Sequence, residues 1–193
     1  MNDYTILVNR EYLLPRDYVP KNLVVTDENE NNFHHYKDPS LKPMIRADVL
    51  PYFLKMQKAA LEVGVHILID SGYRSYDYQE FVLKKNILEK GDEAYFTVAL
   101  PGASEHQTGL AIDIAYYRDG VYTDAVYDGD KEVEWLKENS YKFGFVLRYP
   151  KGKESITHIS YEPWHYRFVG LELAYKLWEQ DLTLEEYYEK NGK

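Results

Sequence analysis

Apolar residues recur at helical spacing in several segments of the chain. Between residues 48 and 63 they form a broad stripe close to the 3.6-residue period, with Pro51 in the first turn and Gly64 directly after the last apolar position. A proline costs little in a first turn, and glycine often ends a helix. The pattern therefore predicts a helix over 48–63 with Asp48 as its N-cap.

The same spacing predicts further helices over 77–88, 130–140 and 168–179. Asp77 and Glu80 are three residues apart, as an N-cap and its N3 partner would be. Thr183 and Glu186 repeat that arrangement and predict a last helix near the C-terminus. The residues expected on the buried side of these helices are Val133, Leu136, Val169, Leu173, Leu177 and Trp178.

Shorter apolar runs predict strands over 65–70, 110–115 and 145–149. In the second run Leu110, Ile112 and Ile114 share one face, while Asp113 lies on the other face between two alanines. Residues 160–164 are expected to be extended, because the residue before a proline is biased that way. Strands and helices alternate without a strict βαβ rhythm. We therefore predict an α+β fold, with helices around a small, mainly antiparallel sheet.

Prolines and a polar run interrupt the first part of the chain. This composition predicts an irregular N-terminal arm over residues 1–40 and a single domain over residues 41–193.

The composition excludes several classes of protein. The chain has 193 residues, 45% of them hydrophobic, which is enough for a core. Its net charge of -9 argues against a nucleic-acid binder, which needs a positive face. No apolar run approaches the roughly 20 residues of a membrane span. The absence of cysteine excludes disulfides, zinc–thiolate sites and cysteine nucleophiles.

Three short polar segments carry the candidate chemistry: residues 71–75 (SGYRS), 104–113 (SEHQTGLAID) and 162–167 (EPWHYR). His106, Asp113 and His165 are a plausible metal set, since two imidazoles and one carboxylate suit zinc and leave a fourth position for water. On spacing alone, the interpretation that these three are unrelated polar residues is favoured over the interpretation that they form a metal site. In a regular strand Glu162 and His165 would also face opposite sides, so the strand must twist at Pro163 or the segment must leave the sheet before His165.

The pattern S-x-H-x-x-G-x-A-x-D, followed by E-P-W-H, resembles the zinc D-alanyl-D-alanine carboxypeptidases of the vancomycin-resistance type, a family that includes bacterial L,D-carboxypeptidases. The SGYRS segment resembles the same family, and the similarity spans residues 41–178. It implies a monomeric hydrolase with one Zn²⁺ ion that removes the C-terminal D-alanine from peptidoglycan stem peptides. The alternatives are a peptidoglycan endopeptidase and a non-catalytic, zinc-stabilised binding module of the same fold.

The resemblance also implies a role for each matching residue. His106, Asp113 and His165 would bind the metal, and Glu162 would be the general base. Arg74 would bind and polarise the substrate near the scissile carbonyl. The residues expected to contact substrate are Ser104, Gln79, Tyr149 and Trp164.

One position departs from the family pattern. His158 stands where related sequences usually have glycine, so the resemblance does not predict the local turn. His34, His35 and His66 are expected to be ordinary surface or core histidines.

The expected location depends on the start of the native chain. Relatives act outside the membrane, and residues 1–4 lack the pattern of a signal peptide. We expect action at the cell wall if a signal or anchor precedes this chain, and a cytoplasmic protein if Met1 is the native start.

Overall fold

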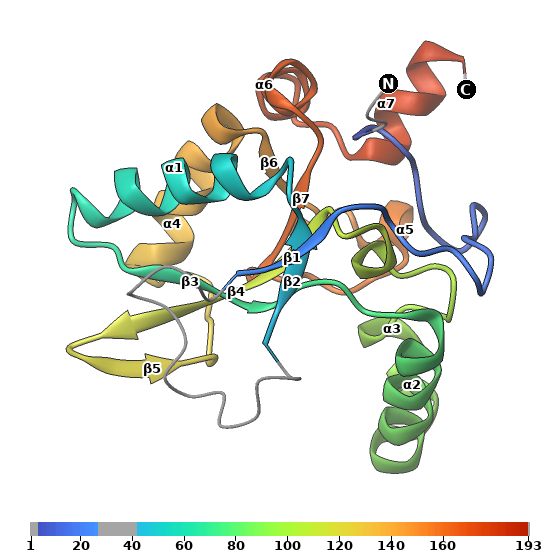
Figure 1. Ribbon diagram of the computed structural model, residues 1–193. Coiled ribbons are helices and arrows are strands. Elements are labelled where there is room, and N and C mark those ends of the chain that lie inside the picture. The colour runs from blue at the N-terminus through green and yellow to red at the C-terminus, as the bar shows by residue number, and fades with distance from the viewer. Residues whose placement is uncertain (1–3, 27–41, 193) are drawn as a thin grey trace.

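A five-stranded antiparallel sheet lies at the centre of the fold (Figure 1). The computed structural model of the chain describes residues 4–26 and 42–192. The main sheet has the order β3 (Ile67–Ser71), β4 (Ala111–Arg118), β7 (His165–Phe168) and β6 (Phe145–Leu147), and β5 (Val121–Thr123) forms a hairpin with β4. A separate antiparallel pair joins β1 (Leu23–Val25) to β2 (Met44–Arg46). The predicted α+β class with a small antiparallel sheet is confirmed.

Helices flank this sheet, and Figure 1 shows α1 and α4 close together on one side while α2 and α3 extend away at the other end of the molecule. The α-helices are α1 (Leu50–Leu61), α2 (Tyr76–Lys90), α3 (Ala94–Thr97), α4 (Lys131–Asn139), α5 (Glu154–Thr157), α6 (Leu171–Glu179) and α7 (Leu184–Asn191). Three 3₁₀ helices in the described chain are η2 (Gly91–Glu93), η3 (Glu105–Thr108) and η4 (Ser140–Phe143).

The two faces of the sheet have different contents. Ile112 and Ile114 of β4 and Phe168 of β7 point into the main apolar core, where they pack with α1 and α4. Because side chains alternate along a strand, Asp113 and His165 lie on the opposite face. The predicted division of residues 110–115 between two faces is confirmed, and it leaves one face of the sheet for polar chemistry.

The described part of the N-terminal segment runs across the domain. The backbone N–H of Leu14 donates to the carbonyl of Gly102 at 2.8 Å, and the side chain of Gln107 donates to the carbonyl of Pro15 at 2.9 Å. Arg167 of β7 donates to the carbonyl of Ile6 at 2.7 Å. The predicted boundary at residue 40 lies outside the described residues and remains a prediction.

Two predicted helix caps are wrong. Helix α1 begins at Leu50, and the carboxylate of Asp48 accepts hydrogen bonds from Arg46 and Tyr4 instead of capping the helix. Helix α2 begins at Tyr76, and its N-cap is Ser75, whose hydroxyl accepts from the N–H of Tyr78. Arg46 and Tyr4 compete for the carboxylate of Asp48, whereas Ser75 directly precedes α2 and takes the N-cap position ahead of Asp77. The predicted capping box at residues 183–186 is confirmed.

The last third of the chain differs most from the prediction. Phe168 ends strand β7, so helix α6 begins three residues later than expected, at Leu171. Trp178, which the sequence predicts to be buried, is 47% exposed, and its ring stacks on that of Tyr141 with centroids 3.9 Å apart. The strands β1, β2 and β5 and helix α5 have only three or four residues each, too few for a periodic signal.

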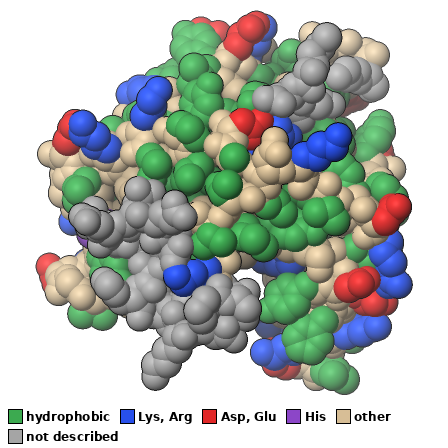
Figure 2. All heavy atoms as spheres, in the orientation of Figure 1, with side chains coloured by type: hydrophobic (Ala, Val, Ile, Leu, Met, Phe, Trp, Pro, Cys, Tyr) green, Lys and Arg blue, Asp and Glu red, His purple; other side chains and the backbone are tan. Residues whose placement is uncertain are grey.

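Helices α2 and α3 carry exposed apolar side chains, which Figure 2 shows at the lower right of the molecule. Tyr78 and Phe81 stack with ring centroids 5.9 Å apart, and Phe96 is 60% exposed. The same two helices also contribute to the wall of the cavity described below.

Candidate active site

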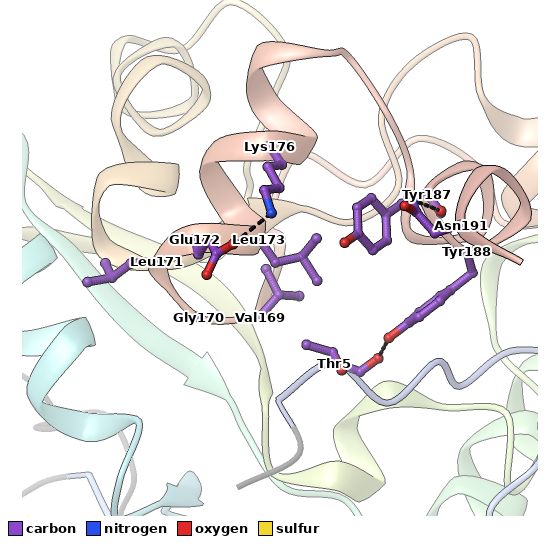
Figure 3. Close-up of a pocket in the computed structure, with 10 residues that line it drawn as sticks. All are labelled: Thr5, Val169, Gly170, Leu171, Glu172, Leu173, Lys176, Tyr187, Tyr188 and Asn191. Carbon is purple, nitrogen blue, oxygen red and sulfur yellow. Dashed lines mark hydrogen bonds and ion pairs between the residues drawn. The ribbon is translucent and has the colours of Figure 1, made fainter. Parts of the chain in front are cut away.

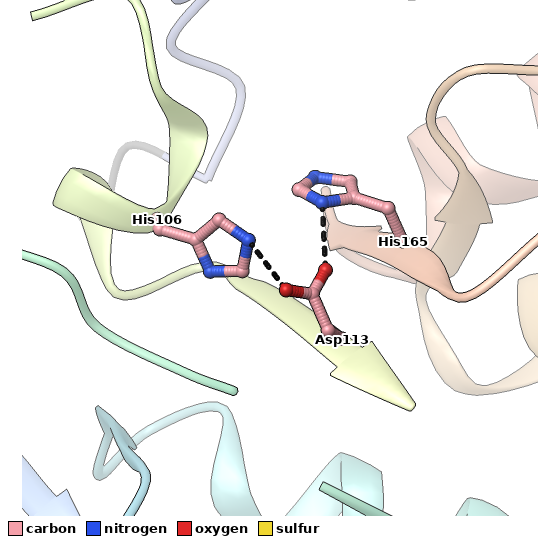
Figure 4. Close-up of side chains that lie close together, drawn as sticks. All are labelled: His106, Asp113 and His165. Carbon is pink, nitrogen blue, oxygen red and sulfur yellow. Dashed lines mark hydrogen bonds and ion pairs between the residues drawn. The ribbon is translucent and has the colours of Figure 1, made fainter. Parts of the chain in front are cut away.

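Three predicted metal ligands lie close together although they come from distant parts of the sequence (Figure 4). His106 comes from η3, Asp113 from β4 and His165 from the first position of β7, where it pairs directly with Asp113 across the sheet. The Nε2 atom of His106 lies 3.2 Å from Oδ2 of Asp113, and Nδ1 of His165 lies 3.0 Å from Oδ1 of the same carboxylate. One ligand atom from each residue lies within 4.8 Å of the other two. Two imidazoles and a carboxylate in this arrangement suit a zinc ion.

A backbone carbonyl orients His106. Its Nδ1 atom lies 2.7 Å from the carbonyl oxygen of Gly72, and because a carbonyl only accepts, Nδ1 must carry the proton. The lone pair of Nε2 then faces Asp113. Burial lowers the pKa of His106, which favours this neutral form. A side chain at position 72 would not fit, since its Cβ would lie 2.2 Å from the carbonyl oxygen of Met44.

Glu162 reaches the same site because the chain turns at Pro163 and Trp164. The N–H of His165 donates to the carbonyl of Glu162 at 3.2 Å, and strand β7 begins only at His165. The expectation that residues 160–164 are extended is therefore wrong for residues 163 and 164, which form a turn. The segment enters the sheet only after this turn, at His165. The Oε2 atom of Glu162 lies 3.8 Å from Nδ1 of His165. Burial raises the pKa of Glu162 to about 7, and the negative charge of Asp113 adds to this effect.

Arg74 lies beside the carboxylate of Asp113. Its guanidinium donates to Oε1 of Gln79 at 3.0 Å and to the hydroxyl of Ser71 at 3.2 Å, and one nitrogen lies 3.5 Å from Oδ2 of Asp113. The backbone N–H of Arg74 donates to the carbonyl of His106 at 3.2 Å. These contacts place a fixed positive charge next to the predicted metal ligands.

All nine predicted site residues line one cavity of about 170 Å³. They are Arg74, Gln79, Ser104, His106, Asp113, Tyr149, Glu162, Trp164 and His165. The ring centroid of Tyr149 lies 4.8 Å from that of His165, next to one of the three predicted ligands. The sequence analysis did not find the other wall residues, which are mostly apolar and carry no chemical signal: Val82, Thr97, Val98, Ala99 and Ile159.

Ser104 is buried at the edge of this cavity. It holds the N-cap position of η3, yet its hydroxyl makes no capping hydrogen bond. The turn-forming role that serine often has does not account for it here.

A larger cavity of about 420 Å³ lies between α6, α7 and the N-terminal segment (Figure 3). Among the described residues that line it, the charged side chains are Lys176 and Glu172, which pair with one another at 2.7 Å. None of the predicted site residues borders it. Size alone therefore does not mark the functional site in this protein.

The other two described histidines, His66 and His158, do not line this cavity. His158 is exposed and has a left-handed backbone with φ of 59°, the conformation that glycine adopts easily, so the turn forms without glycine. It lines a different cavity, together with residues of α7. The ring of His66 contacts Tyr117 at 5.2 Å. His34 and His35 lie outside the described residues.

Directly behind the metal ligands lies a buried group of charged side chains that the sequence analysis missed. Glu105 is fully buried, and its Oε1 accepts hydrogen bonds from Arg148 and Arg167 at 2.7 Å each. Arg148 also donates to Glu185 of α7 at 2.6 and 2.9 Å. Burial alone would raise the pKa of Glu105, but the two guanidinium groups hold that pKa well below its usual range. Arg167 lies in β7 between Tyr166 and Phe168, and Arg148 follows β6 between Leu147 and Tyr149, so an arginine flanked by apolar or aromatic residues was the available signal.

Comparison with known proteins identifies the family. Residues 42–171 match the model of the VanY family, described as D-alanyl-D-alanine carboxypeptidase. The chain is 41% identical over 188 residues to the putative carboxypeptidase YodJ of Bacillus subtilis, covering 97% of this chain and 67% of that protein. It is 38% identical over 192 residues to a D-alanyl-D-alanine carboxypeptidase of Enterococcus faecalis, covering 94% of this chain and 64% of that protein. The chain thus spans about two thirds of the length of these relatives.

Solved structures agree with this match. The LdcB LD-carboxypeptidase superposes with a TM-score of 0.84 at 40% identity, over 95% of this chain and 85% of that one. The D,D-pentapeptidase VanY of the VanB-type resistance cassette, solved in complex with Zn(II), gives a TM-score of 0.79 at 36% identity, over 96% of this chain and 99% of that one. VanYB in complex with D-alanine-D-alanine gives a TM-score of 0.80 at 37% identity, over 98% of this chain and 99% of that one. The chain belongs to the VanY family of D-alanyl-D-alanine carboxypeptidases.

Proposed function

We propose that this protein is a zinc-dependent carboxypeptidase that removes the C-terminal D-alanine from peptidoglycan stem peptides. The observation that carries the proposal is the meeting of His106, Asp113 and His165 with the carboxylate of Glu162 in one cavity. Family membership supports the reaction class, and the Zn(II) and D-alanine-D-alanine complexes of related proteins support the metal and the substrate.

The side chains fit a zinc ion. Gly72 holds the proton of His106 on Nδ1, so Nε2 offers a lone pair, and Nδ1 of His165 and the Asp113 carboxylate face the same point. Three protein ligands leave a position for water or substrate. When bound, zinc supplies a Lewis acid that polarises the scissile carbonyl and makes water available as a nucleophile near neutral pH.

Glu162 is the proposed general base. Its carboxylate accepts a proton from the attacking water as the water oxygen bonds to the scissile carbonyl carbon. The carboxyl group then delivers that proton to the nitrogen of the departing D-alanine as the C–N bond breaks. The products are the shortened stem peptide and free D-alanine. The pKa of Glu162, raised to about 7 by burial, suits a group that takes and returns a proton.

Arg74 and the remaining cavity residues are proposed to hold the substrate. The guanidinium of Arg74 is anchored by Gln79 and Ser71, and its proposed role is to stabilise negative charge on the scissile carbonyl oxygen. Ser104 is proposed to donate to the terminal carboxylate or to the backbone of the peptide. Tyr149 and Trp164 are proposed to form the walls against which the peptide packs.

The proposal covers both L,D- and D,D-cleavage, because LdcB and VanY resemble this chain to a similar degree. We further propose a monomer that acts outside the cytoplasm, where peptidoglycan is found. In the described part of the chain, no helix combines the length and the apolar character that crossing a bilayer requires.

The test is mass spectrometry of synthetic tri-, tetra- and pentapeptide stems after incubation with the protein. Release of D-alanine from the tetrapeptide would show L,D-activity, and release from the pentapeptide D,D-activity. Cleavage inside the stem would instead show an endopeptidase. The matched control is Glu162→Ala, which should bind zinc as the wild type does and release no D-alanine. Equal release by both proteins would rule out Glu162 as the base. No release of D-alanine by the wild type would refute the carboxypeptidase proposal in favour of the non-catalytic binding module.

A further inference from the structure

The buried group behind the metal ligands contains two polar atoms that face each other without other partners. The Oε2 atom of Glu105 and the Nε2 atom of His165 are both buried and have no hydrogen-bond partner among the described residues. They lie 3.7 Å apart, a few tenths of an ångström beyond a hydrogen bond. A carboxylate oxygen accepts and an imidazole N–H donates, so the two atoms are complementary.

The position of Glu105 is fixed from behind. Its Oε1 atom accepts from both Arg148 and Arg167, so the carboxyl plane cannot turn without breaking two charge-assisted hydrogen bonds. Arg167 is held in turn by the carbonyls of Tyr4 and Ile6, and Arg148 by Glu185. The second oxygen of Glu105 is therefore held facing His165.

We infer that Glu105 is a positioning residue that selects the tautomer of His165. With Nε2–H directed at Glu105, the lone pair lies on Nδ1, the atom that faces Asp113 and the proposed metal position. In His106 the roles of the two nitrogens are reversed: the Gly72 carbonyl holds the proton on Nδ1, and the lone pair lies on Nε2. Outer partners of this kind orient metal-binding histidines and raise their basicity. The inference rests on the zinc centre proposed above and adds a residue that does not line the cavity.

Glu105→Gln gives a sharp test because the arginines only donate. The amide oxygen of glutamine must face Arg148 and Arg167, which directs the amide NH₂ at Nε2 of His165. That nitrogen must then accept, so the proton of a neutral ring moves to Nδ1 and blocks the proposed ligand atom. We expect zinc affinity, measured by competition with a chelator, to fall by about 10- to 100-fold.

Glu132→Gln is the matched control. Glu132 is also buried and pairs with Arg118 at 2.7 Å, but it lies on α4 and contacts none of the metal ligands. Its substitution removes a buried carboxylate charge, as Glu105→Gln does, and should leave zinc affinity unchanged.

A second measurement needs no variant. Long-range ¹H–¹⁵N spectra of the zinc-loaded wild type should show His165 protonated on Nε2. Protonation on Nδ1, or wild-type zinc affinity in a folded Glu105→Gln protein, would overturn the inference while the zinc centre stood. Failure of the wild type to bind zinc at all would overturn the proposed function and this inference together.

Discussion

Replacing Gly72 with alanine should damage the metal site from a residue that contributes no ligand. The new Cβ would lie 2.2 Å from the carbonyl oxygen of Met44, and ordinary contact begins at 3.4 Å, so the backbone must move by about 1.2 Å. The carbonyl of Gly72 accepts the 2.7 Å hydrogen bond from Nδ1 of His106, and such a bond does not survive a displacement of that size.

Two effects should follow from this displacement. Overpacking of this kind costs about 1–3 kcal/mol of unfolding free energy. Losing the orienting partner of a metal-binding histidine should weaken zinc binding by about 10- to 100-fold. Urea denaturation measures the first effect, and chelator competition on the folded protein measures the second.

Gly152→Ala separates the two effects. Gly152 has φ of 86° with no atom within 4 Å of the position of a Cβ, so alanine there costs about 1–2 kcal/mol of backbone strain without a clash. Its zinc affinity should equal that of the wild type. If Gly72→Ala also bound zinc with wild-type affinity, the role assigned to the Gly72 carbonyl would be wrong.

Four further outcomes are expected. Arg74→Ala should lower kcat/KM by about 10²–10³ with little change in Tm, since it removes a donor to developing negative charge; a large drop in Tm with normal kcat/KM would make this residue structural. Chelation should abolish activity and added Zn²⁺ should restore it, and elemental analysis that finds no divalent metal in active protein would refute the zinc centre. Phe168→Ala should cost about 3–5 kcal/mol in urea denaturation, because its ring packs against Tyr4, Tyr52 and Phe145; a cost below 1 kcal/mol would contradict this packing. Thr183→Ala should cost about 1 kcal/mol by removing the capping box of α7, and unchanged stability would show that the cap contributes nothing.

Local patterns predicted the elements whose signal is contained within a few residues. The alternation of Leu110, Ile112 and Ile114 predicted which face of this segment packs into the main apolar core, and the spacing of Thr183 and Glu186 predicted the cap of α7. The family resemblance predicted nine residues that all line the cavity but none of the other wall residues, because a motif records chemistry and not the apolar packing around it.

Competition between neighbours was not predictable in this way. Asp48 is of a residue type that often caps helices, but Arg46 and Tyr4 bind its carboxylate. Tyr4 lies 44 residues away in the sequence. Trp178 has the spacing of a core residue, but it is exposed and covers only part of its ring against Tyr141. The contact of Asp48 with Tyr4 joins segments that are far apart along the chain, and local spacing does not record it.

The sequence by itself determined the chemical groups of this protein: the two imidazoles, the carboxylates and the arginine that the proposed reaction needs. Only the tertiary structure decided how they meet. The pairing of Asp113 with His165 across β4 and β7, the turn that brings Glu162 beside them and the burial of Glu105 between two arginines all result from strand register and packing. Register and packing are set by the whole core, so no short stretch of sequence contains them.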